Sequence, residues 1–339
     1  MKAIRINEPR QMEVADICQP ELKDGEVMLK VNYVGFCGSD LNTFRGLNPM
    51  VNMPVITGHE IGATIIGKGK DVPAELVEGM AVTVNPYTNC GKCASCRAGQ
   101  PNACEHNETL GVQRNGAMQE YIAIPWEKVI PASGLPTKTC ALVEPMSVGF
   151  HAVRRSGATE KDTVLVFGCG MIGMGAIVCA SLLGANVIAV DLDDEKLELS
   201  KKFGVKYTIN SKKENLHERL LELTDGFGPS VAIEAVGSPA TYQAAINEIS
   251  FAGRVVCIGY AKQDISFQTK LFVQKELTIR GSRNAMPEDF QAVIAQLTKS
   301  KMDVSPLISA VVKPEEAFDA MTQWDANPGK VFRILVDFN

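Results

Sequence analysis

The chain has 339 residues, of which 45% are hydrophobic and 22% are charged, and its formal net charge is -5. This length and composition predict a folded protein of two domains and exclude a mainly disordered chain. Because the charge is negative and the Lys and Arg residues are scattered, the sequence argues against nucleic acid as a partner.

The N-terminal segment, MKAIRINEPRQMEVADICQPELKDGE, mixes charged and apolar residues from the start. It lacks the apolar core of a secretory signal peptide, so the mature protein is expected to begin near Met1. Ten cysteines, four of them within fifteen residues, favour metal-bound thiolates in a reducing compartment over disulfides. We therefore expect a cytoplasmic protein.

Residues 1 to about 136 contain short alternating segments, such as VMLKVNYV, ATIIG and AVTVNP, between Gly and Pro turns. This pattern predicts a β-rich domain. Here a lone Cys37 and the pair His59 and Glu60, together with Glu144 just beyond, are candidate metal ligands. Each could equally be structural, as a buried thiol, a satisfied histidine or an ordinary carboxylate.

A loop in the same region carries the spacing C-x2-C-x2-C-x7-C, formed by Cys90, Cys93, Cys96 and Cys104. Four thiolates with this spacing can close a tetrahedron and leave no position for water, which predicts a structural zinc site. An iron–sulfur cluster or free thiols are the alternatives, and the absence of a second nearby cysteine set favours zinc.

From about residue 140 to 283, apolar β runs such as VLVF, NVIAV, VAIEAV and RVVCIG alternate with helical patterns such as DDEKLELSKKF. This alternation predicts an α/β domain with a doubly wound parallel sheet and helices on both faces. The stretch from Thr163 to Val190 has no charged residue and is long enough to span a bilayer. Glycines interrupt it and β-branched residues gather at its ends, so we expect strand, turn, helix and strand, and no membrane segment.

The segment VLVFGCGMIGMGA fits the dinucleotide-binding pattern G-x-G-x-x-G at Gly168, Gly170 and Gly173. The first glycine permits a tight turn, the second lets the backbone approach a pyrophosphate, and the third lets the helix pack on the strand. Met171 and Ile172 open that helix, whose N-terminus would hold the phosphates.

Asp191 ends the next strand, NVIAVD, about 20 residues further on. Its carboxylate would accept hydrogen bonds from the ribose hydroxyls and repel a 2′-phosphate, so NAD is favoured over NADP. The alternative is that Asp191 caps the helix that follows.

The tail from about residue 284 contains a helical pattern, PEDFQAVIAQLTKSK, and a strand-like VFRILVDF. It is too short to form a domain of its own. We therefore predict a catalytic domain over residues 1–140, a dinucleotide-binding domain over 141–283 and a return segment over 284–339 that completes the first domain.

Motifs along essentially the whole chain resemble those of the medium-chain, zinc-containing alcohol dehydrogenase family and occur in the same order. They are GFCGSD at 35–40, GHEIGA at 58–63, the four-cysteine loop, NGAMQEY at 115–121, LVEPMSVGFHA at 142–152 and the GCGMIG turn. The resemblance implies a GroES-like catalytic domain and a Rossmann domain, two zinc ions per chain, NAD, and a homodimer or homotetramer.

By this resemblance, Cys37, His59 and Glu60 match the catalytic zinc ligands, and Glu144 stands at the fourth-ligand position. A Glu followed by Pro-Met-Ser-Val resembles the sorbitol and polyol dehydrogenases, whereas other alcohol dehydrogenases carry a cysteine there. In the polyol branch this glutamate binds zinc directly or through a water, and the sequence leaves both open.

Ser39 corresponds to the family's hydroxyl that takes the proton from the alcohol; its alternative is a simple turn residue. Five residues after Cys37, many relatives place a histidine that passes the proton to solvent, but this chain has Asn42. Because Asn cannot titrate, a water chain or another group must complete the relay.

Two arginines are candidate substrate-side residues. Arg283 aligns loosely with an arginine that relatives place near the nicotinamide and substrate, or it forms a surface salt bridge. Arg45 is the candidate for binding a substrate carboxylate. The segments FRGLNP and GSRNAMPEDF also resemble bacterial dehydrogenases of sugar acids such as L-galactonate or L-gulonate.

We therefore expect zinc-dependent, NAD-linked oxidation of a secondary alcohol on a small-molecule polyol or sugar acid. Threonine or a polyol phosphate is the alternative substrate. A regulatory NAD-binding protein without catalysis is a rival, against which stand the retained Cys37, His59 and Ser39. A zinc-ribbon interaction module would explain only the four-cysteine loop.

Overall fold

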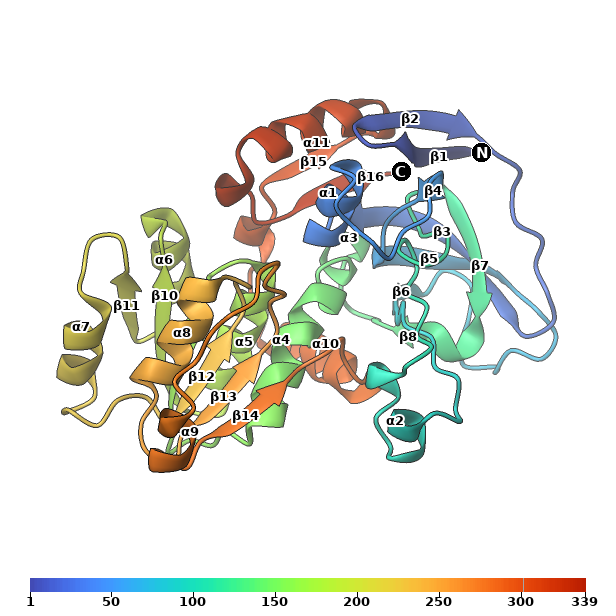
Figure 1. Cartoon of the computed structure of the whole chain (residues 1–339). Coiled ribbons are helices and arrows are strands. Elements are labelled where there is room, and N and C mark those ends of the chain that lie inside the picture. The colour runs from blue at the N-terminus through green and yellow to red at the C-terminus, as the bar shows by residue number, and fades with distance from the viewer. Residues whose placement is uncertain (301) are drawn as a thin grey trace. The chain divides into compact units, whose positions relative to one another are not determined.

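The computed structural model describes residues 1–300 and 302–339 and divides the chain into two compact units. Unit 1 is formed by Met1–Glu144 together with Met286–Asn339, and unit 2 by Pro145–Ala285. The helix α4 (Val143–Ser156) carries the chain out of unit 1 and into unit 2 (Figure 1).

Unit 1 is built on two β-sheets. The larger sheet has the order β15-β16-β3-β5-β6-β8, and β7 also pairs with β3. Its strands are β3 (Glu26–Gly35), β5 (Glu60–Lys68), β6 (Ala81–Val84), β7 (Tyr121–Pro125), β8 (Val129–Pro131), β15 (Ala310–Val312) and β16 (Ile334–Asp337). The smaller sheet has the order β2-β1-β4, with β1 (Lys2–Glu8), β2 (Gln11–Asp16) and β4 (Val55–Ile56).

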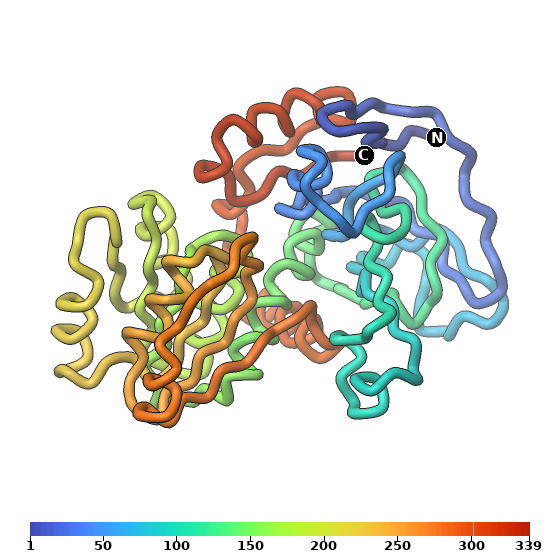
Figure 2. Tube along the Cα trace, viewed as in Figure 1, coloured from blue at the N-terminus to red at the C-terminus, as the bar shows by residue number. Residues whose placement is uncertain are grey.

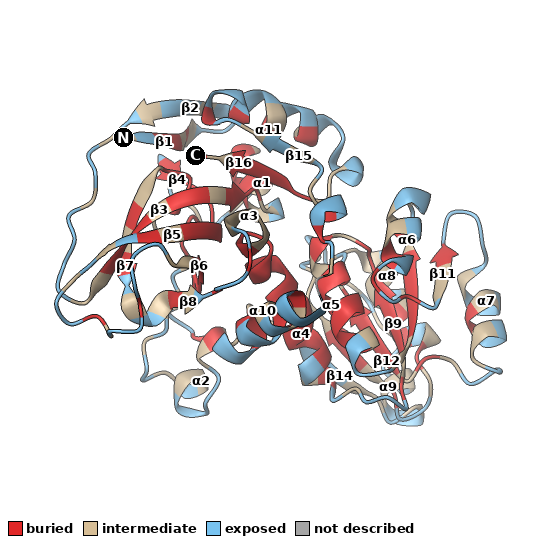
Figure 3. Cartoon of the chain, turned by 180° about the vertical axis from the view of Figure 1, so that it is seen from behind, coloured by how far each residue is buried: buried red, intermediate tan, exposed pale blue. Residues whose placement is uncertain are grey.

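Strand β3 is the centre of the larger sheet, and its sequence explains why. Val27, Leu29, Val31 and Val34 have no exposed surface, because the strand pairs with β5, β7 and β16 and is covered by the core. Burial of such side chains contributes about 1.5–3 kcal/mol each. Figure 3 shows β3 and β5 as buried strands, whereas β2 is mostly exposed or half-buried.

The C-terminal segment returns to unit 1 and completes its sheet. Strand β16 pairs antiparallel with the end of β3, with Leu335 opposite Gly35 and Val336 opposite Val34. Figure 2 shows this last segment beside the first residues of the chain, so both termini lie in unit 1.

Short helices connect the strands of unit 1. The α-helices are α1 (Gly38–Phe44), α2 (Ala94–Arg97), α3 (Thr137–Cys140), α10 (Pro287–Ser300) and α11 (Ala317–Ala326). The 3-10 helices are η1 (Pro101–Ala103), η2 (Trp126–Lys128), η3 (Ser305–Leu307), η4 (Pro314–Glu316) and η5 (Pro328–Lys330).

Unit 2 is a parallel sheet of the order β11-β10-β9-β12-β13-β14, with helices on both faces (Figure 1). The strands are β9 (Thr163–Phe167), β10 (Asn186–Asp191), β11 (Tyr207–Asn210), β12 (Val231–Glu234), β13 (Arg254–Cys257) and β14 (Thr278–Gly281). The helices are α5 (Met171–Leu182), α6 (Asp194–Lys201), α7 (Leu216–Leu223), α8 (Pro239–Glu248) and α9 (Lys270–Gln274). The predicted doubly wound Rossmann sheet is thus confirmed.

The strand order of unit 2 reverses between β9 and β12, because the chain first builds outward through β10 and β11 and then continues on the other side of β9. Ligands of such sheets bind at this reversal, beyond the carboxyl ends of the strands. The uncharged stretch forms β9, α5 and β10, as predicted. In the described part of the chain, no helix is long and apolar enough to cross a membrane.

Candidate active site

The structure brings Cys37, His59 and Glu60 together, with their candidate ligand atoms all within 4.8 Å of one another. The sheet register explains how. Gly35, the last residue of β3, lies opposite both Glu60, the first residue of β5, and Leu335 of β16. The residues that follow β3 and precede β5 therefore meet at one end of the sheet, and Cys37 begins α1 there as its N-cap.

Polar atoms of this cluster are buried without hydrogen bonds. Nδ1 of His59 and Oε1 of Glu60 have no hydrogen-bond partner, although native proteins pair nearly all buried polar atoms. A thiolate, an imidazole and a carboxylate are also the donor set that zinc prefers. These residues therefore fit a zinc ion.

The electrostatics of the cluster favour the charged forms of Cys37 and His59, whereas burial raises the pKa of Glu60 well above its usual value. Burial opposes ionisation of Cys37, but the neighbouring His59 and Arg333 outweigh it and lower the pKa of the thiol to about 7. Burial also opposes the charge on His59, yet Cys37, Asp40 and Glu144 raise its pKa well above the usual value. Without metal, the site thus stabilises a thiolate beside an imidazolium, and a divalent cation would displace the imidazolium proton.

Arg333 is a member of this site that the sequence did not reveal. Its side chain is 5% exposed, and its Nε lies 2.9 Å from Oε2 of the buried Glu60. Its Nη1 donates to the backbone oxygen of Phe36. A Cβ on Gly35 would lie 2.2 Å from Oε2 of Glu60, so only glycine fits there. The available signal was an arginine inside the strand-like VFRILVDF.

Glu144 lies at the start of α4, and Tyr87 holds it. The Tyr87 hydroxyl donates to Oε1 of Glu144, and both residues are buried. Burial raises the pKa of Tyr87 well above its usual value, and Glu144 raises it further, so the hydroxyl keeps its proton. Glu144 influences the charge of His59 but does not belong to the 4.8 Å cluster. No motif in the sequence pointed to Tyr87.

The helix α1 carries Ser39 and Asn42, and Arg45 is its C-cap residue. Oγ of Ser39 is buried without a hydrogen-bond partner, although the whole residue is half-buried. Arg45 is bound within the protein, since its Nε lies 2.5 Å from Oδ1 of Asp325 and its Nη2 donates to the Asp325 backbone oxygen at 3.3 Å. The guanidinium of Arg45 is thus already paired with Asp325. The geometry gives no support to the predicted contact between Arg45 and a substrate carboxylate.

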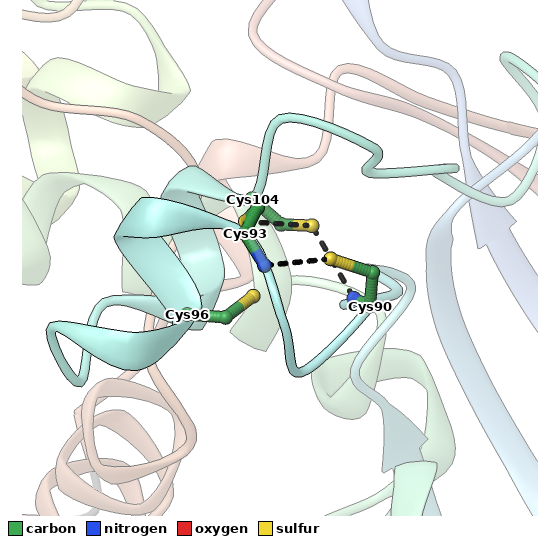
Figure 4. Close-up of side chains that lie close together, drawn as sticks. All are labelled: Cys90, Cys93, Cys96 and Cys104. Carbon is green, nitrogen blue, oxygen red and sulfur yellow. Dashed lines mark hydrogen bonds between the residues drawn. The ribbon is translucent and has the colours of Figure 1, made fainter.

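The four cysteines of the predicted structural site converge, as Figure 4 shows. The backbone N–H of Cys90 donates to Sγ of Cys104, and that of Cys93 donates to Sγ of Cys90, both at 3.3 Å. The Ser95 hydroxyl and backbone N–H groups lower the pKa of Cys93 to about 5. Four sulfurs that lie within 4.8 Å of one another and accept from such amide donors fit structural zinc.

The glycine turn of unit 2 has the geometry of a dinucleotide site. Gly168 follows β9 with a φ of +91°, and Gly170 is the N-cap of α5, which Met171 and Ile172 begin. A Cβ on Gly173 would lie 1.8 Å from the backbone oxygen of Gly168, so α5 can approach the turn only with glycine there. The three glycines thus lie where the dinucleotide-binding pattern needs them, at the tight turn, at the start of the helix and at the contact between helix and turn.

Asp191 ends β10 beside this turn. Its Oδ2 accepts from the backbone N–H of Cys169, and its Oδ1 from that of Leu192, both at 2.7 Å. The N-cap of α6 is Asp193, whose side chain accepts from the backbone of Glu195 and Lys196. The alternative that Asp191 caps this helix is therefore wrong.

Glu234 is a further residue beside the turn that the sequence analysis missed. It ends β12, is fully buried, and accepts from the backbone N–H groups of Val236 at 3.0 Å and Gly237 at 2.8 Å. A Cβ on Gly168 would lie 2.8 Å from a methyl carbon of Val236, so this loop adjoins the glycine turn. The sequence feature that could have indicated Glu234 is an acidic residue at the end of a buried strand, next to the point where the strand order reverses. Arg283, by contrast, follows β14 and is half-buried.

Comparison with known proteins places these sites in one family. Residues 23–135 match the alcohol dehydrogenase GroES-like domain, and residues 172–299 match the zinc-binding dehydrogenase domain. The L-galactonate-5-dehydrogenase of Escherichia coli K12 is 34% identical over 84% of this chain and 84% of its own length. The sorbitol dehydrogenase of Halalkalibacterium halodurans is 30% identical over 91% and 92%.

The chain belongs to the zinc-type alcohol dehydrogenase family. Among solved structures, the NADH complex of the E. coli CFT073 alcohol dehydrogenase rspB superimposes with a TM-score of 0.91, at 30% identity and 99% coverage of both chains. The family resemblance predicted from the motifs, with its GroES-like and Rossmann folds, is confirmed. The protein is a zinc-dependent alcohol oxidoreductase.

Proposed function

We propose that this enzyme oxidises a secondary hydroxyl of a polyol or sugar acid with NAD. The observation that carries the proposal is the cluster of the half-buried Cys37 with the buried His59 and Glu60, which has a carboxylate, Glu144, beside it instead of a second thiolate. The names of the sorbitol and L-galactonate relatives support the same substrate class.

In this proposal Cys37, His59 and Glu60 hold the catalytic zinc, which as a Lewis acid makes the substrate hydroxyl proton easier to remove. Arg333 fixes the Glu60 carboxylate and balances its charge. Ser39, with its hydroxyl buried and unpaired, accepts and passes on the proton.

On the cofactor side, the turn at Gly168, Gly170 and Gly173 and the start of α5, with Met171 and Ile172, receive the pyrophosphate. Asp191 accepts the ribose hydroxyls and excludes a 2′-phosphate. Arg283 is proposed to lie on the nicotinamide side of this site. The structural zinc is held by Cys90, Cys93, Cys96 and Cys104.

The substrate assignment is tested by NAD reduction across polyols, aldonates, polyol phosphates and threonine, with zinc measured by elemental analysis. We expect turnover of a polyol or aldonate and about two zinc ions per chain. Turnover of only threonine or a polyol phosphate would replace the proposed substrate class. NADH binding without turnover of any alcohol would favour the regulatory alternative.

The proton exit is tested at position 42, where this chain has Asn on α1. We expect Asn42→His to preserve activity and to change the pH dependence of kcat, because an imidazole titrates near neutral pH and an amide does not. An unchanged pH profile would argue against a relay through this position.

We further propose a homodimer or homotetramer in the cytoplasm. Strand β14 is an edge strand and could pair with another subunit. Apolar side chains are exposed here, since Ile279 of β14 is 42% exposed and Val273 of the preceding helix α9 is 83% exposed. Free cysteines suit a reducing compartment. Light scattering after gel filtration would give the number of subunits.

A further inference from the structure

Tyr87 is held in one position by its surroundings. It is 6% exposed and lies three residues before Cys90, so it leads into the four-cysteine loop. Its ring meets the ring of the fully buried Phe290 edge to face, with centroids 6.4 Å apart. Its backbone N–H donates to Oδ1 of Asn85 at 3.1 Å. The hydroxyl therefore has little freedom to move.

That hydroxyl is directed at one oxygen of Glu144. Tyr87 donates to Oε1 of a carboxylate that is only 4% exposed. The bond runs from the phenol hydroxyl to the carboxylate oxygen, so Tyr87 is the donor. Tyr87 thus restrains the carboxylate that lies beside the ligand cluster.

The position of Glu144 matters because it determines whether the zinc ion would have three or four protein ligands. Zinc sites with four protein ligands are closed and structural, whereas catalytic sites have three protein ligands and one open position. Cys37, His59 and Glu60 already supply three. If Glu144 also bound the metal, the protein itself would fill the open position.

We propose that Tyr87 is a positioning residue that holds the Glu144 carboxylate outside the Cys37–His59–Glu60 ligand set and so keeps the fourth position open. This inference rests on the proposed function of that cluster. It also gives the four-cysteine loop a second task, because the loop anchors the segment that carries Tyr87.

The test is a double-mutant cycle of Tyr87→Phe and Glu144→Gln, read in cobalt-substituted protein. The Phe variant removes the hydroxyl but keeps the ring against Phe290. The visible absorption of Co²⁺ reports its ligands and needs no substrate, and the four-cysteine site contributes the same background to each variant. Tyr121→Phe, in β7 of the same unit, is the matched control.

We expect Tyr87→Phe to change the cobalt spectrum and to lower kcat/KM roughly 10- to 100-fold, in the range seen for changes outside the ligand shell of a metal site. In the Glu144→Gln background, the same change should have a clearly smaller effect on both quantities, because the neutral amide oxygen accepts a weaker hydrogen bond than the carboxylate does. Tyr121→Phe should resemble the unmodified protein.

A cobalt spectrum unchanged by Tyr87→Phe would overturn the inference, and so would an equal effect of Tyr87→Phe in the Glu144→Gln background. If the spectra follow the expected cycle but no alcohol is oxidised, the proposed function fails and the positioning role stands. If alcohols are oxidised but the cycle shows no coupling, only the role of Tyr87 fails.

Discussion

Arg333 brings a positive charge into the interior of unit 1, against the carboxylate of Glu60. Both side chains are at most 5% exposed. Removing one member of a buried ion pair leaves the other charge unpaired, which costs about 3–5 kcal/mol. We therefore expect Arg333→Gln to lower the free energy of unfolding by about that amount, as measured by urea denaturation.

The matched control is Arg10→Gln, because the Arg10 side chain is 64% exposed in its ion pair with Asp325. Exposed pairs contribute about 0–1 kcal/mol, so this variant should remain close to the parent protein. Equal losses for the two arginines would contradict the view that Glu60 depends on a buried partner.

Sequence reasoning pointed to the candidate ligands of the site but not to the residues that contact them. Cys37, His59 and Glu60 stand in recognisable motifs. Tyr87 and Arg333 do not, because their importance comes from partners distant in the chain; Tyr87 and Glu144 are 57 positions apart. The pairing of β3 with β5 and β16, for example, brings Arg333 next to Glu60.

At the scale of elements, alanine substitutions of two glycines in the turn between β9 and α5 can be compared with each other. A Cβ on Gly173 would lie 1.8 Å from a backbone oxygen, whereas a Cβ on Gly170 has nothing within 4 Å. We expect Gly173→Ala to lower the free energy of unfolding by about 1–3 kcal/mol, since the helix must move.

Gly170→Ala should leave stability within about 0.5 kcal/mol of the parent protein. It should nevertheless weaken NADH binding roughly tenfold, a loss of about 1.4 kcal/mol, because the methyl group occupies the path of the pyrophosphate. Denaturation and NADH fluorescence titration measure the two effects. If Gly170→Ala left NADH affinity unchanged, the turn would not bind the pyrophosphate as proposed.

The four-cysteine loop is a second element that can be tested, because we expect its fold to depend on bound zinc. Its only regular structure is the four-residue α2 and the three-residue η1, too little to hold a fold without cross-links. We expect Cys96→Ser to reduce zinc from about two ions per chain to about one and to lower Tm. Cys18→Ser, which removes an exposed cysteine outside the cluster, should retain the zinc content; an equal loss would contradict the assignment.

Elements with local signals were predicted well. The apolar runs and glycines that predicted strand, turn and helix between Thr163 and Val190 form β9, α5 and β10. The helical pattern after residue 286 forms α10, up to Ser300, and Lys301 lies outside the described residues. The sheet of unit 1 could not be ordered from the sequence, because the pairing of β16 with β3 joins segments from opposite ends of the chain.

At the scale of the whole molecule, each unit has a hydrophobic cluster of its own. In unit 1 the cluster combines residues from both ends of the chain, such as Ile4, Leu29 and Trp324. In unit 2 it is formed by residues such as Leu165 and Ile188. A unit with its own core can unfold as its own cooperative transition.

The two kinds of ligand should therefore stabilise different transitions in scanning calorimetry. If NADH binds unit 2 as proposed, a concentration one hundred times its Kd should stabilise that unit by about 2.7 kcal/mol and raise its Tm. A zinc chelator should instead lower the Tm of unit 1, which carries both cysteine-containing clusters. Gly173→Ala and Cys96→Ser identify the transitions, because the first weakens unit 2 and the second weakens unit 1. The opposite outcome is a single transition whose Tm shifts with either ligand and with either variant. The two cores would then unfold together, coupled by α4, which is continuous from one unit to the other.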